Sequence, residues 1–149
     1  MIRPYKYTDR KELVEIFKLN IPAYFDPKEL TDFEEYLEQN SASYLIIEYE
    51  NKVVGGAGYN FQEKDNIGRI TWIFFHPNYK GLGLGKKMVA RCLSILKLNV
   101  ALEKVVVTTS QLAYRFFEKF GFLLKKTEKD YWGAGLDLYV MELPVNNNS

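Results

Sequence analysis

Apolar residues in the first forty positions recur every three or four residues, a spacing typical of amphipathic helices. Residues 2–5 form a predicted strand ahead of the first helix, which Thr8 or Asp9 opens. Asp9 and Glu12 have the spacing of a capping box. The second helix begins at Asp26-Pro27-Lys28-Glu29, where a cap is followed by a proline at the first helical position and by a carboxylate. The pattern therefore predicts one strand and two helices.

After residue 42 the pattern changes to runs of β-branched and aromatic residues, which favour strands. Residues 43–50 and 52–61 are predicted strands, joined by a hairpin turn at residues 50–52. Residues 62–68 form a predicted turn and residues 69–75 a third strand. Pro77 keeps this strand from extending further, because proline cannot donate to a ladder.

The second half alternates helices with strands. Apolar residues at helical spacing predict a helix over residues 84–98, and the apolar run 104–109 has the length of a buried strand. Residues 111–120 form a second, aromatic helix that Gly121 closes. Two last strands, 122–125 and 136–143, are joined around residues 133–135.

The order of these elements, β-α-α-β-β-β-α-β-α-β-β, predicts an α/β fold of the α+β type, with a mixed sheet and helices on its faces. We expect a single domain over residues 1–145 and a fraying tail over residues 146–149.

Composition narrows the functional classes. The net charge of +1 and the lack of a basic stripe argue against nucleic-acid binding. The single cysteine, Cys92, excludes an intramolecular disulfide, and the lone His76 argues against a zinc site, so no metal is expected. No apolar run has transmembrane length and no export signal is present. We therefore expect a cytoplasmic protein that does not bind membranes.

The segment Lys80-Gly81-Leu82-Gly83-Leu84-Gly85 lies where a turn becomes a helix. A helix N-terminus presents unpaired amides and about half a positive elementary charge, which suits an anionic phosphate. Glycine leaves room for the phosphate, and the lysines at 80, 86 and 87 add positive charge. The segment fits neither the dinucleotide pattern nor the nucleotide-triphosphate loop. The alternative is a glycine-rich helix cap without a ligand.

This segment resembles the Gln/Arg-x-x-Gly-x-Gly/Ala loop of the GNAT superfamily of N-acetyltransferases, and residues 75–79 resemble the strand end that precedes it. The run from Ser110 to Phe122 is similar to the family's second motif, Asn-x-x-Ala-x-x-x-Tyr-Glu-x-x-Gly-Phe. The resemblance extends from Val53 to Phe122. It implies a three-layer α/β/α GNAT fold. It also implies an enzyme that transfers an acetyl group from acetyl-CoA, or a related acyl-CoA, to a primary amine.

The resemblance also implies roles for individual residues. The pantetheine arm is expected between the third strand and its parallel neighbour, residues 104–109, where a free amide of Phe74 or Phe75 would bind the thioester carbonyl. The residues that the resemblance places against the cosubstrate are Ile73, Phe74, Phe75, Lys80, Gly81, Leu82, Gly83, Leu84, Gly85, Lys86, Ser110 and Phe117.

Phe117 departs from the family, which usually has a tyrosine there to protonate the leaving thiolate. Phenylalanine cannot donate a proton, so either the thiolate leaves unassisted, which a thiol pKa of about 8.5 permits, or another hydroxyl reaches it. Tyr114 is the first substitute, because it lies three residues earlier on adjoining helix surface, and Tyr131 is the second. For both tyrosines, packing without a catalytic role is the alternative.

No single carboxylate stands out as the base for the amine. Candidates lie in the predicted turn 62–68 and around the second helix, where the family builds its acceptor site; they are Glu63, Asp65, Asp26, Glu29, Asp32, Glu34 and Glu35. His76 titrates near neutrality, but beside Pro77 it is expected to shape the turn. Cys92 is expected in the core.

Other functions stay open at the level of sequence. Phe117 favours a CoA-binding sensor that has lost catalysis, and the aromatic share of 15% is compatible with a protein-interaction domain that needs no cosubstrate. The acceptor could be a polyamine, an amino acid, an antibiotic or a protein amine. The sequence also leaves a homodimer open.

Overall fold

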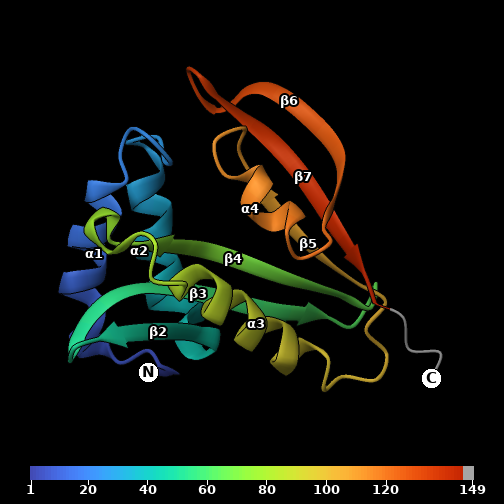
Figure 1. Ribbon diagram of the computed structural model, residues 1–149, viewed down its shortest axis with the longest axis horizontal. Helices are drawn as coiled ribbons and strands as arrows, with labels where there is room; N and C mark the ends of the chain where they lie inside the picture. The colour runs from blue at the N-terminus through green and yellow to red at the C-terminus, as the bar shows by residue number, and fades with distance from the viewer. Residues whose placement is uncertain (146–149) are drawn as a thin grey trace.

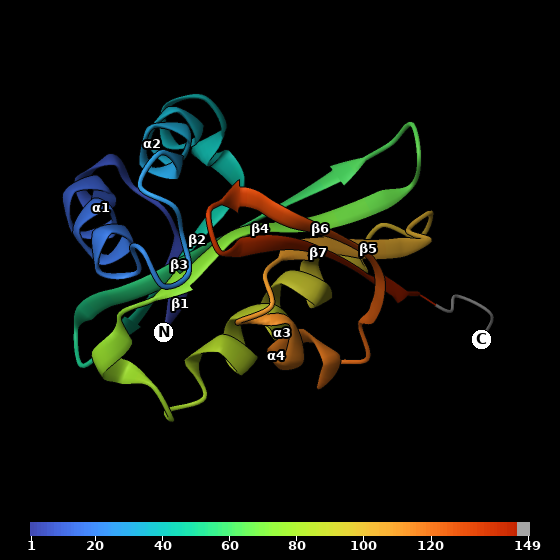
Figure 2. The ribbon, with the colours of Figure 1, turned by 90° about the horizontal axis from the view of Figure 1, so that it is seen from above.

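Within residues 1–145, which the computed structural model describes, seven strands form one mixed sheet with the order β1-β2-β3-β4-β5-β7-β6. Helices α1 and α2 cover one face of the sheet, and α3 and α4 cover the other (Figure 1, Figure 2). The expected three-layer α/β fold is therefore confirmed. The expected tail, residues 146–149, lies outside the described residues. The element bounds, in chain order, are β1 (Ile2–Pro4), α1 (Arg10–Leu19), α2 (Glu29–Asn40), β2 (Tyr44–Tyr49), β3 (Lys52–Gln62), β4 (Ile67–Phe75), α3 (Leu84–Leu96), β5 (Lys104–Thr109), α4 (Tyr114–Glu118), β6 (Leu123–Gly133) and β7 (Leu136–Pro144).

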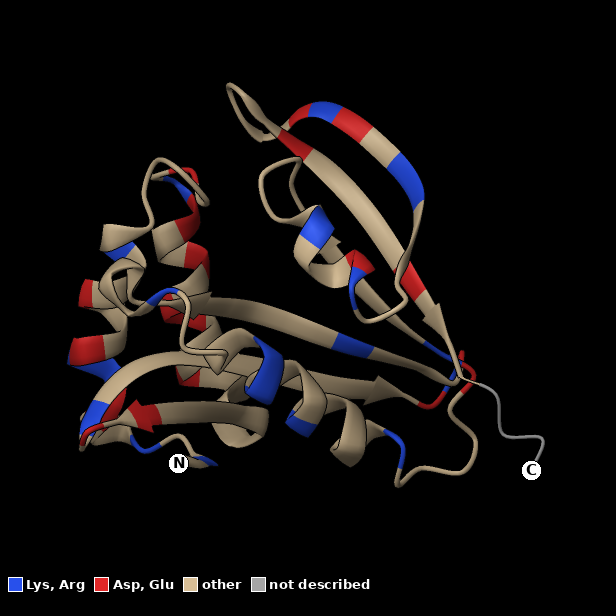
Figure 3. Ribbon diagram, viewed as in Figure 1, with Lys and Arg blue, Asp and Glu red and all other residues tan. Residues whose placement is uncertain are grey.

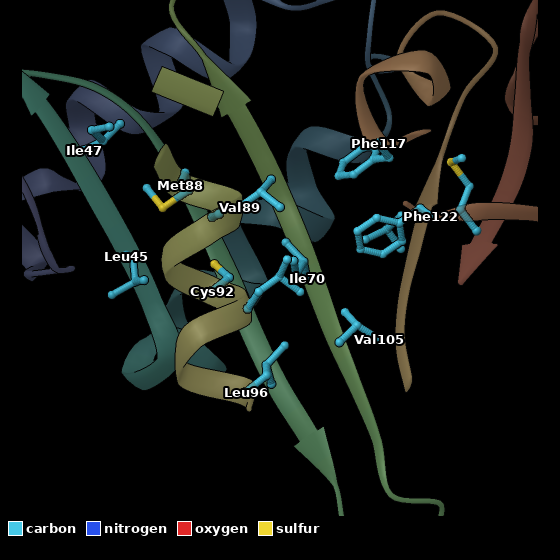
Figure 4. Packing of buried hydrophobic residues seen from close by; sticks show 14 of the residues in the cluster. Leu45, Ile47, Ile70, Met88, Val89, Cys92, Leu96, Val105, Phe117 and Phe122 are labelled. Carbon is cyan, nitrogen blue, oxygen red and sulfur yellow. The ribbon is translucent and has the colours of Figure 1, made fainter. Parts of the chain in front are cut away.

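Two apolar clusters hold the three layers together. The cluster under α3 and α4 includes Met88, Cys92, Leu96, Ile70 and Val105 (Figure 4). Cys92 is fully buried there, as expected, and burial raises the pKa of its thiol to about 12. On the opposite face, Phe17 of α1 stacks on Phe33 of α2 with ring centroids 5.0 Å apart. The sheet is thus buried on both faces near its middle.

Most elements end within two residues of their predicted bounds, but α4 and β6 differ by more. α4 has five residues instead of the expected 111–120, because Gln111 bonds to the β6–β7 hairpin instead of joining the helix. Its Nε2 donates to the carbonyl of Gly135 at 2.6 Å, and its Oε1 accepts from the amide of Asp137 at 2.9 Å. β6 extends over eleven residues instead of 122–125. Its polar stretch is an exposed edge strand held by backbone pairing with β7, so it shows no apolar alternation.

One predicted turn and one predicted helix cap are confirmed. Glu50 and Asn51, with φ angles of 51° and 64°, form the tight turn between β2 and β3. The cap predicted for the second helix is present as hydrogen bonds: the amide of Lys28 donates to Asp26 Oδ2 at 3.1 Å, and the amide of Asp26 donates to Glu29 Oε2 at 2.8 Å.

The capping box predicted for Asp9 and Glu12 is wrong, because the Asp9 carboxylate has other partners. It accepts hydrogen bonds from the Arg3 guanidinium at 2.8 and 2.9 Å and from the amide of Lys6 at 2.8 Å. Arg3 also donates to Glu48 of β2 at 3.2 Å, so this group ties β1 and β2 to the start of α1. The Arg3 guanidinium lowers the pKa of Asp9 below its usual range.

We predict that Asp9→Asn destabilises the protein near neutral pH by about 1–3 kcal/mol, the usual contribution of hydrogen bonds between charged groups. Because the pKa of Asp9 is lower in the folded state, its stabilisation is present above the unfolded pKa of about 3.9 and is lost as pH falls through the folded pKa. Denaturant unfolding of both proteins, at neutral pH and near pH 3, measures the difference. A difference that stays constant with pH would contradict the role of the charge.

Candidate active site

β4 and β5 are paired over only a short distance and then separate. Their parallel pairing covers Ile67–Arg69 of β4 and 104–106 of β5, although β4 continues to Phe75 and β5 to Thr109. Figure 1 shows the two strands diverging toward their carboxyl ends. The separation expected for the pantetheine arm is therefore present in the fold.

The register of β4 decides which amide faces this opening. His76 donates its amide to the carbonyl of Val54 on β3 at 2.8 Å, and Phe75 lies opposite Gly55. In an antiparallel ladder, alternate residues turn their polar groups to the neighbouring strand, so Phe74 faces β3 and Phe75 faces the opening. The Phe74 amide is thus engaged with β3, and of the two expected donors Phe75 has the free position.

Asn20, which the sequence analysis did not single out, secures the end of β4. Its side chain is buried, and its Nδ2 donates to the carbonyls of Ile16 at 2.9 Å and Phe75 at 3.1 Å. Asn20 follows α1, so only the tertiary structure brings it to β4. An asparagine after a helix has many local explanations, and the sequence held no signal for this contact.

The glycine loop lies just beyond β4, at the start of α3. Gly81 and Gly83 have left-handed φ angles of 82° and 73°, and a Cβ at either position would meet no atom within 4 Å. The loop surface is therefore open, as the phosphate hypothesis requires. Gly85 differs, because a Cβ there would lie 2.9 Å from the ring of Phe116. That glycine is needed for packing of α3 against α4.

Lysines surround this loop. Figure 3 shows basic residues along the first turns of α3, whereas acidic residues gather on α1 and α2. The Lys80 ammonium lies 5.6 Å from the ring centroid of Tyr24 in the loop between α1 and α2. The Leu82 side chain is exposed, and that of Leu84 is buried in the core, so Leu84 can contribute only main-chain groups to a ligand.

The β5–α4 connection lies on the other side of the opening. Ser110 is buried, and its hydroxyl accepts a hydrogen bond from the amide of Leu112 at 3.2 Å. Phe117 is also buried, and its ring meets that of Phe122 edge to face (Figure 4). Tyr114 is half-buried with its ring centroid 4.9 Å from that of Tyr139. Tyr131 lies more than half exposed on β6, so it is the weaker of the two proposed proton donors.

The loop between α1 and α2 meets the tip of the β6–β7 hairpin, as Figure 2 shows. Any side chain at Gly133 would collide with the carboxylate of Asp26. Trp132 donates its indole N–H to the carbonyl of Thr109 at 3.1 Å, which fixes the hairpin to the end of β5. The α1–α2 loop and the hairpin tip, joined by these contacts, form a rim at the opening.

The structure separates the candidate carboxylates. Glu63 and Asp65 lie in the β3–β4 turn, about 25 Å of strand away from Phe75, so they are not near the opening. Glu34 is paired with Arg10 at 3.1 Å. Glu29 is buried beside the rim, and burial raises the pKa of its carboxyl. His76 accepts a hydrogen bond from the amide of Asn78 at its Nδ1, 3.1 Å away, and so shapes the turn as expected.

Among residues 1–145, no group of three or more His, Cys, Asp or Glu side chains is arranged to hold a metal ion. No helix in the same range combines the length and the apolar character needed to cross a bilayer.

The separated strands and the glycine loop at a helix N-terminus match the arrangement that the sequence resemblance implies for an acyl-CoA-dependent transferase. The sequence profile of the acetyltransferase (GNAT) family matches residues 10–122, and the chain belongs to that family. It is an N-acetyltransferase that uses acetyl-CoA.

Two sequence relatives and one solved structure of the same fold illustrate the similarity. An N-alpha-acetyltransferase of Sulfurisphaera tokodaii is 26% identical over an alignment of 161 residues with its gaps. The alignment covers 97% of this chain and 92% of the relative. The N-acetylaspartate synthetase of Xenopus tropicalis is 28% identical over 97 residues, 63% of this chain and 36% of that protein. An acetyltransferase structure from Salmonella typhimurium with its cofactor acetyl-CoA has a TM-score of 0.73 at 20% identity, and the match covers 100% of this chain and 95% of that one.

We predict that Gly83→Leu weakens CoA binding by about tenfold or more, because a side chain would project into the open loop surface. Gly135→Leu is the matched control, since Gly135 also has a left-handed φ, of 78°, and open space around its Cβ position. Both variants should lose similar stability from backbone strain. Calorimetric titration with CoA and thermal unfolding compare them. Equal affinities would contradict a phosphate role for the loop.

Proposed function

We propose that this acetyltransferase acts on the α-amine of a peptide or protein N-terminus, in the opening between β4 and β5. The observation that carries the site of acetyl transfer is the opening itself, where the free edge of β4 adjoins the glycine loop. The relative from Sulfurisphaera tokodaii, an N-alpha-acetyltransferase along nearly the whole chain, supports this acceptor class. The shorter similarity to an N-acetylaspartate synthetase favours free amino acids as a second candidate.

Main-chain groups would hold acetyl-CoA, which supplies an activated acetyl group as a thioester. In this proposal the amides of residues 81–86 bind the pyrophosphate, with Lys80 and Lys86 adding positive charge. The free edge of β4 at Ile73 and Phe75 binds the pantetheine arm as an added strand would. The Phe75 amide then donates to the thioester oxygen, where negative charge develops during attack. Such a donor typically contributes about 100- to 1,000-fold in rate.

The acceptor approaches from the rim formed by the α1–α2 loop and the β6–β7 hairpin. An amine attacks only when neutral, and near pH 7.5 roughly a third of an α-amine is neutral, against roughly one lysine side chain in a thousand. An α-amine therefore needs little help from a base. Glu29 is the candidate base of this rim, because its raised pKa makes it a stronger proton acceptor than an exposed carboxylate.

The acceptor class is tested by the rate of CoA thiol release with three kinds of amine. These are short peptides with a free N-terminus, the same peptides with a blocked N-terminus and an internal lysine, and free aspartate. We expect kcat/KM for the free N-terminus to exceed that for the lysine peptide by about tenfold or more. Preference for aspartate would select the second candidate. Binding of acetyl-CoA without turnover of any amine would favour a sensor, the alternative that Phe117 raises.

We propose Tyr114 as the proton donor to the leaving thiolate, because Phe117 stands where the family usually has a tyrosine for this purpose. Its half-buried ring lies at the start of α4, directly after the β5–α4 connection, with its centroid 4.9 Å from that of Tyr139. Tyr114→Phe should lower kcat by about 10- to 100-fold and leave the KM for acetyl-CoA within about twofold. Tyr139→Phe, which removes a hydroxyl from the adjoining ring, is the control. Full activity of Tyr114→Phe would mean that the thiolate departs unassisted.

A further inference from the structure

β4 contains a bulge three residues before Phe75. The register between β3 and β4 shifts so that Thr71 lies opposite Gly58 and Phe74 opposite Gly56, which leaves two residues of β4 opposite Ala57. Trp72, the first of the two, has a left-handed φ of 49°. Such a conformation is strained for a bulky residue and persists only where the surroundings hold it.

The bulge decides which way the Phe75 amide points. If β4 ran on without it, Phe74 would lie opposite Gly55 and Phe75 opposite Val54. The alternation of the ladder would then turn the Phe75 amide toward β3 and the Phe74 amide toward the opening. The proposed donor to the thioester oxygen therefore depends on the extra residue in β4.

One buried hydroxyl is hydrogen-bonded to the backbone of the bulge. The Tyr44 side chain, fully buried, donates its hydroxyl to the carbonyl of Trp72 at 2.8 Å. Burial raises the pKa of Tyr44 well above its usual range, so the hydroxyl stays protonated and remains a donor. The carbonyl at a bulge loses its regular partner in the ladder, and a buried carbonyl without a partner is costly.

This contact crosses an entire strand. Tyr44 belongs to β2 and pairs with Gly58 of β3, whereas Trp72 belongs to β4. The ring passes over Gly56 of β3, where a Cβ would lie 2.5 Å from the ring and 2.8 Å from the hydroxyl. Only glycine at that position leaves the ring enough room to reach β4. Gly56 thus has a structural purpose that is separate from that of the glycine loop before α3.

We propose that Tyr44 is a positioning residue for acetyl transfer, because its hydroxyl maintains the β4 bulge that directs the Phe75 amide into the opening. The inference rests on the proposed use of that amide in catalysis. Tyr44 itself touches neither substrate, since it lies on the α1–α2 side of the sheet among Phe33, Ile46 and Phe74. We expect loss of the Tyr44 hydroxyl to slow the chemical step and to leave binding of the CoA moiety unchanged.

Tyr44→Phe tests the proposal, because it removes the hydroxyl and keeps the ring. We expect kcat to fall on the order of 100-fold, the effect of a misplaced catalytic group. The KM for acetyl-CoA and the affinity for CoA should stay within about twofold, because the glycine loop is unchanged. Infrared difference spectra of isotope-labelled acetyl-CoA, bound without acceptor, report on the thioester carbonyl. In the wild type a hydrogen bond from the Phe75 amide should shift this carbonyl band to lower frequency, and in Tyr44→Phe the shift should be lost.

Ile46→Val is the matched control, since Ile46 is fully buried on the same strand and the same face and has no hydrogen bond to β4 through its side chain. It should lower the melting temperature comparably and leave kcat and the carbonyl band unchanged. Gly56→Ala offers a second route, because the added methyl group displaces the Tyr44 ring while the hydroxyl is retained. This variant should show the same loss of kcat.

The outcomes distinguish failure of the positioning role of Tyr44 from failure of the proposed function. Wild-type kcat and an unchanged carbonyl band in Tyr44→Phe would overturn the positioning role while leaving the acetyltransferase proposal intact. Loss of folding in both Tyr44→Phe and Gly56→Ala would also overturn it, since Tyr44 would then be needed for the fold as a whole. If the wild type turned over no amine at all, the proposed function would fail, and the carbonyl band alone would still report whether Tyr44 controls the Phe75 amide.

Discussion

The separation of β4 from β5 is the constraint on which the rest of the molecule depends. Inside a sheet, each strand normally satisfies the backbone groups of its neighbour, and an unpaired edge in the middle of a fold is costly. Here three residue pairs hold the strands together before the strands diverge. The side chains of Phe117 and Phe122 pack in the cluster that includes Ile70 and Val105, on the α3–α4 side of the diverging strands. The edge that remains free is the part of the sheet able to bind an extended ligand.

Glycine serves three physical purposes around this edge. In the loop before α3, Gly81 and Gly83 adopt left-handed conformations and leave an open surface. At Gly85 and Gly56 the absence of Cβ lets an aromatic ring approach the backbone. At Gly133 it lets the hairpin meet the α1–α2 loop. In the sequence these glycines are indistinguishable, and only their neighbours in the folded structure show which purpose each one serves.

The fold was largely predictable from the sequence, because periodicity and turn residues are local signals. The two-residue turn at Glu50 and Asn51, and the cap at Asp26, follow from such signals. The length of β6 did not, since an edge strand exposed on both faces carries no apolar alternation. The position of the glycine loop was also predictable, because a strand, a proline and a helix enclose it.

The site was less predictable wherever it depends on contacts across the fold. Glu63 and Asp65 adjoin β4 in sequence, but the direction of the strand places them at the end where β4 is still paired. The choice between the amides of Phe74 and Phe75 depends on a single extra residue, which no hydrophobic pattern reveals. Tyr44 and Asn20 act through hydrogen bonds to residues 28 and 55 positions away in the chain. Neither has a local signature.

Asn20 has a consequence for how such a protein can change its acceptor. Its side chain holds the end of β4, while its backbone carbonyl accepts hydrogen bonds from the amides of Tyr24 at 2.8 Å and Phe25 at 3.1 Å. One residue thus anchors both the end of β4 and the first turn of the α1–α2 loop, which in the proposed function face the acyl donor and the acceptor. Substitutions further along that loop can alter the shape and charge of the rim while the anchor stays fixed. If the acceptor binds at this rim as proposed, new acceptor specificities are accessible to evolution without a change in the groups that serve acyl transfer.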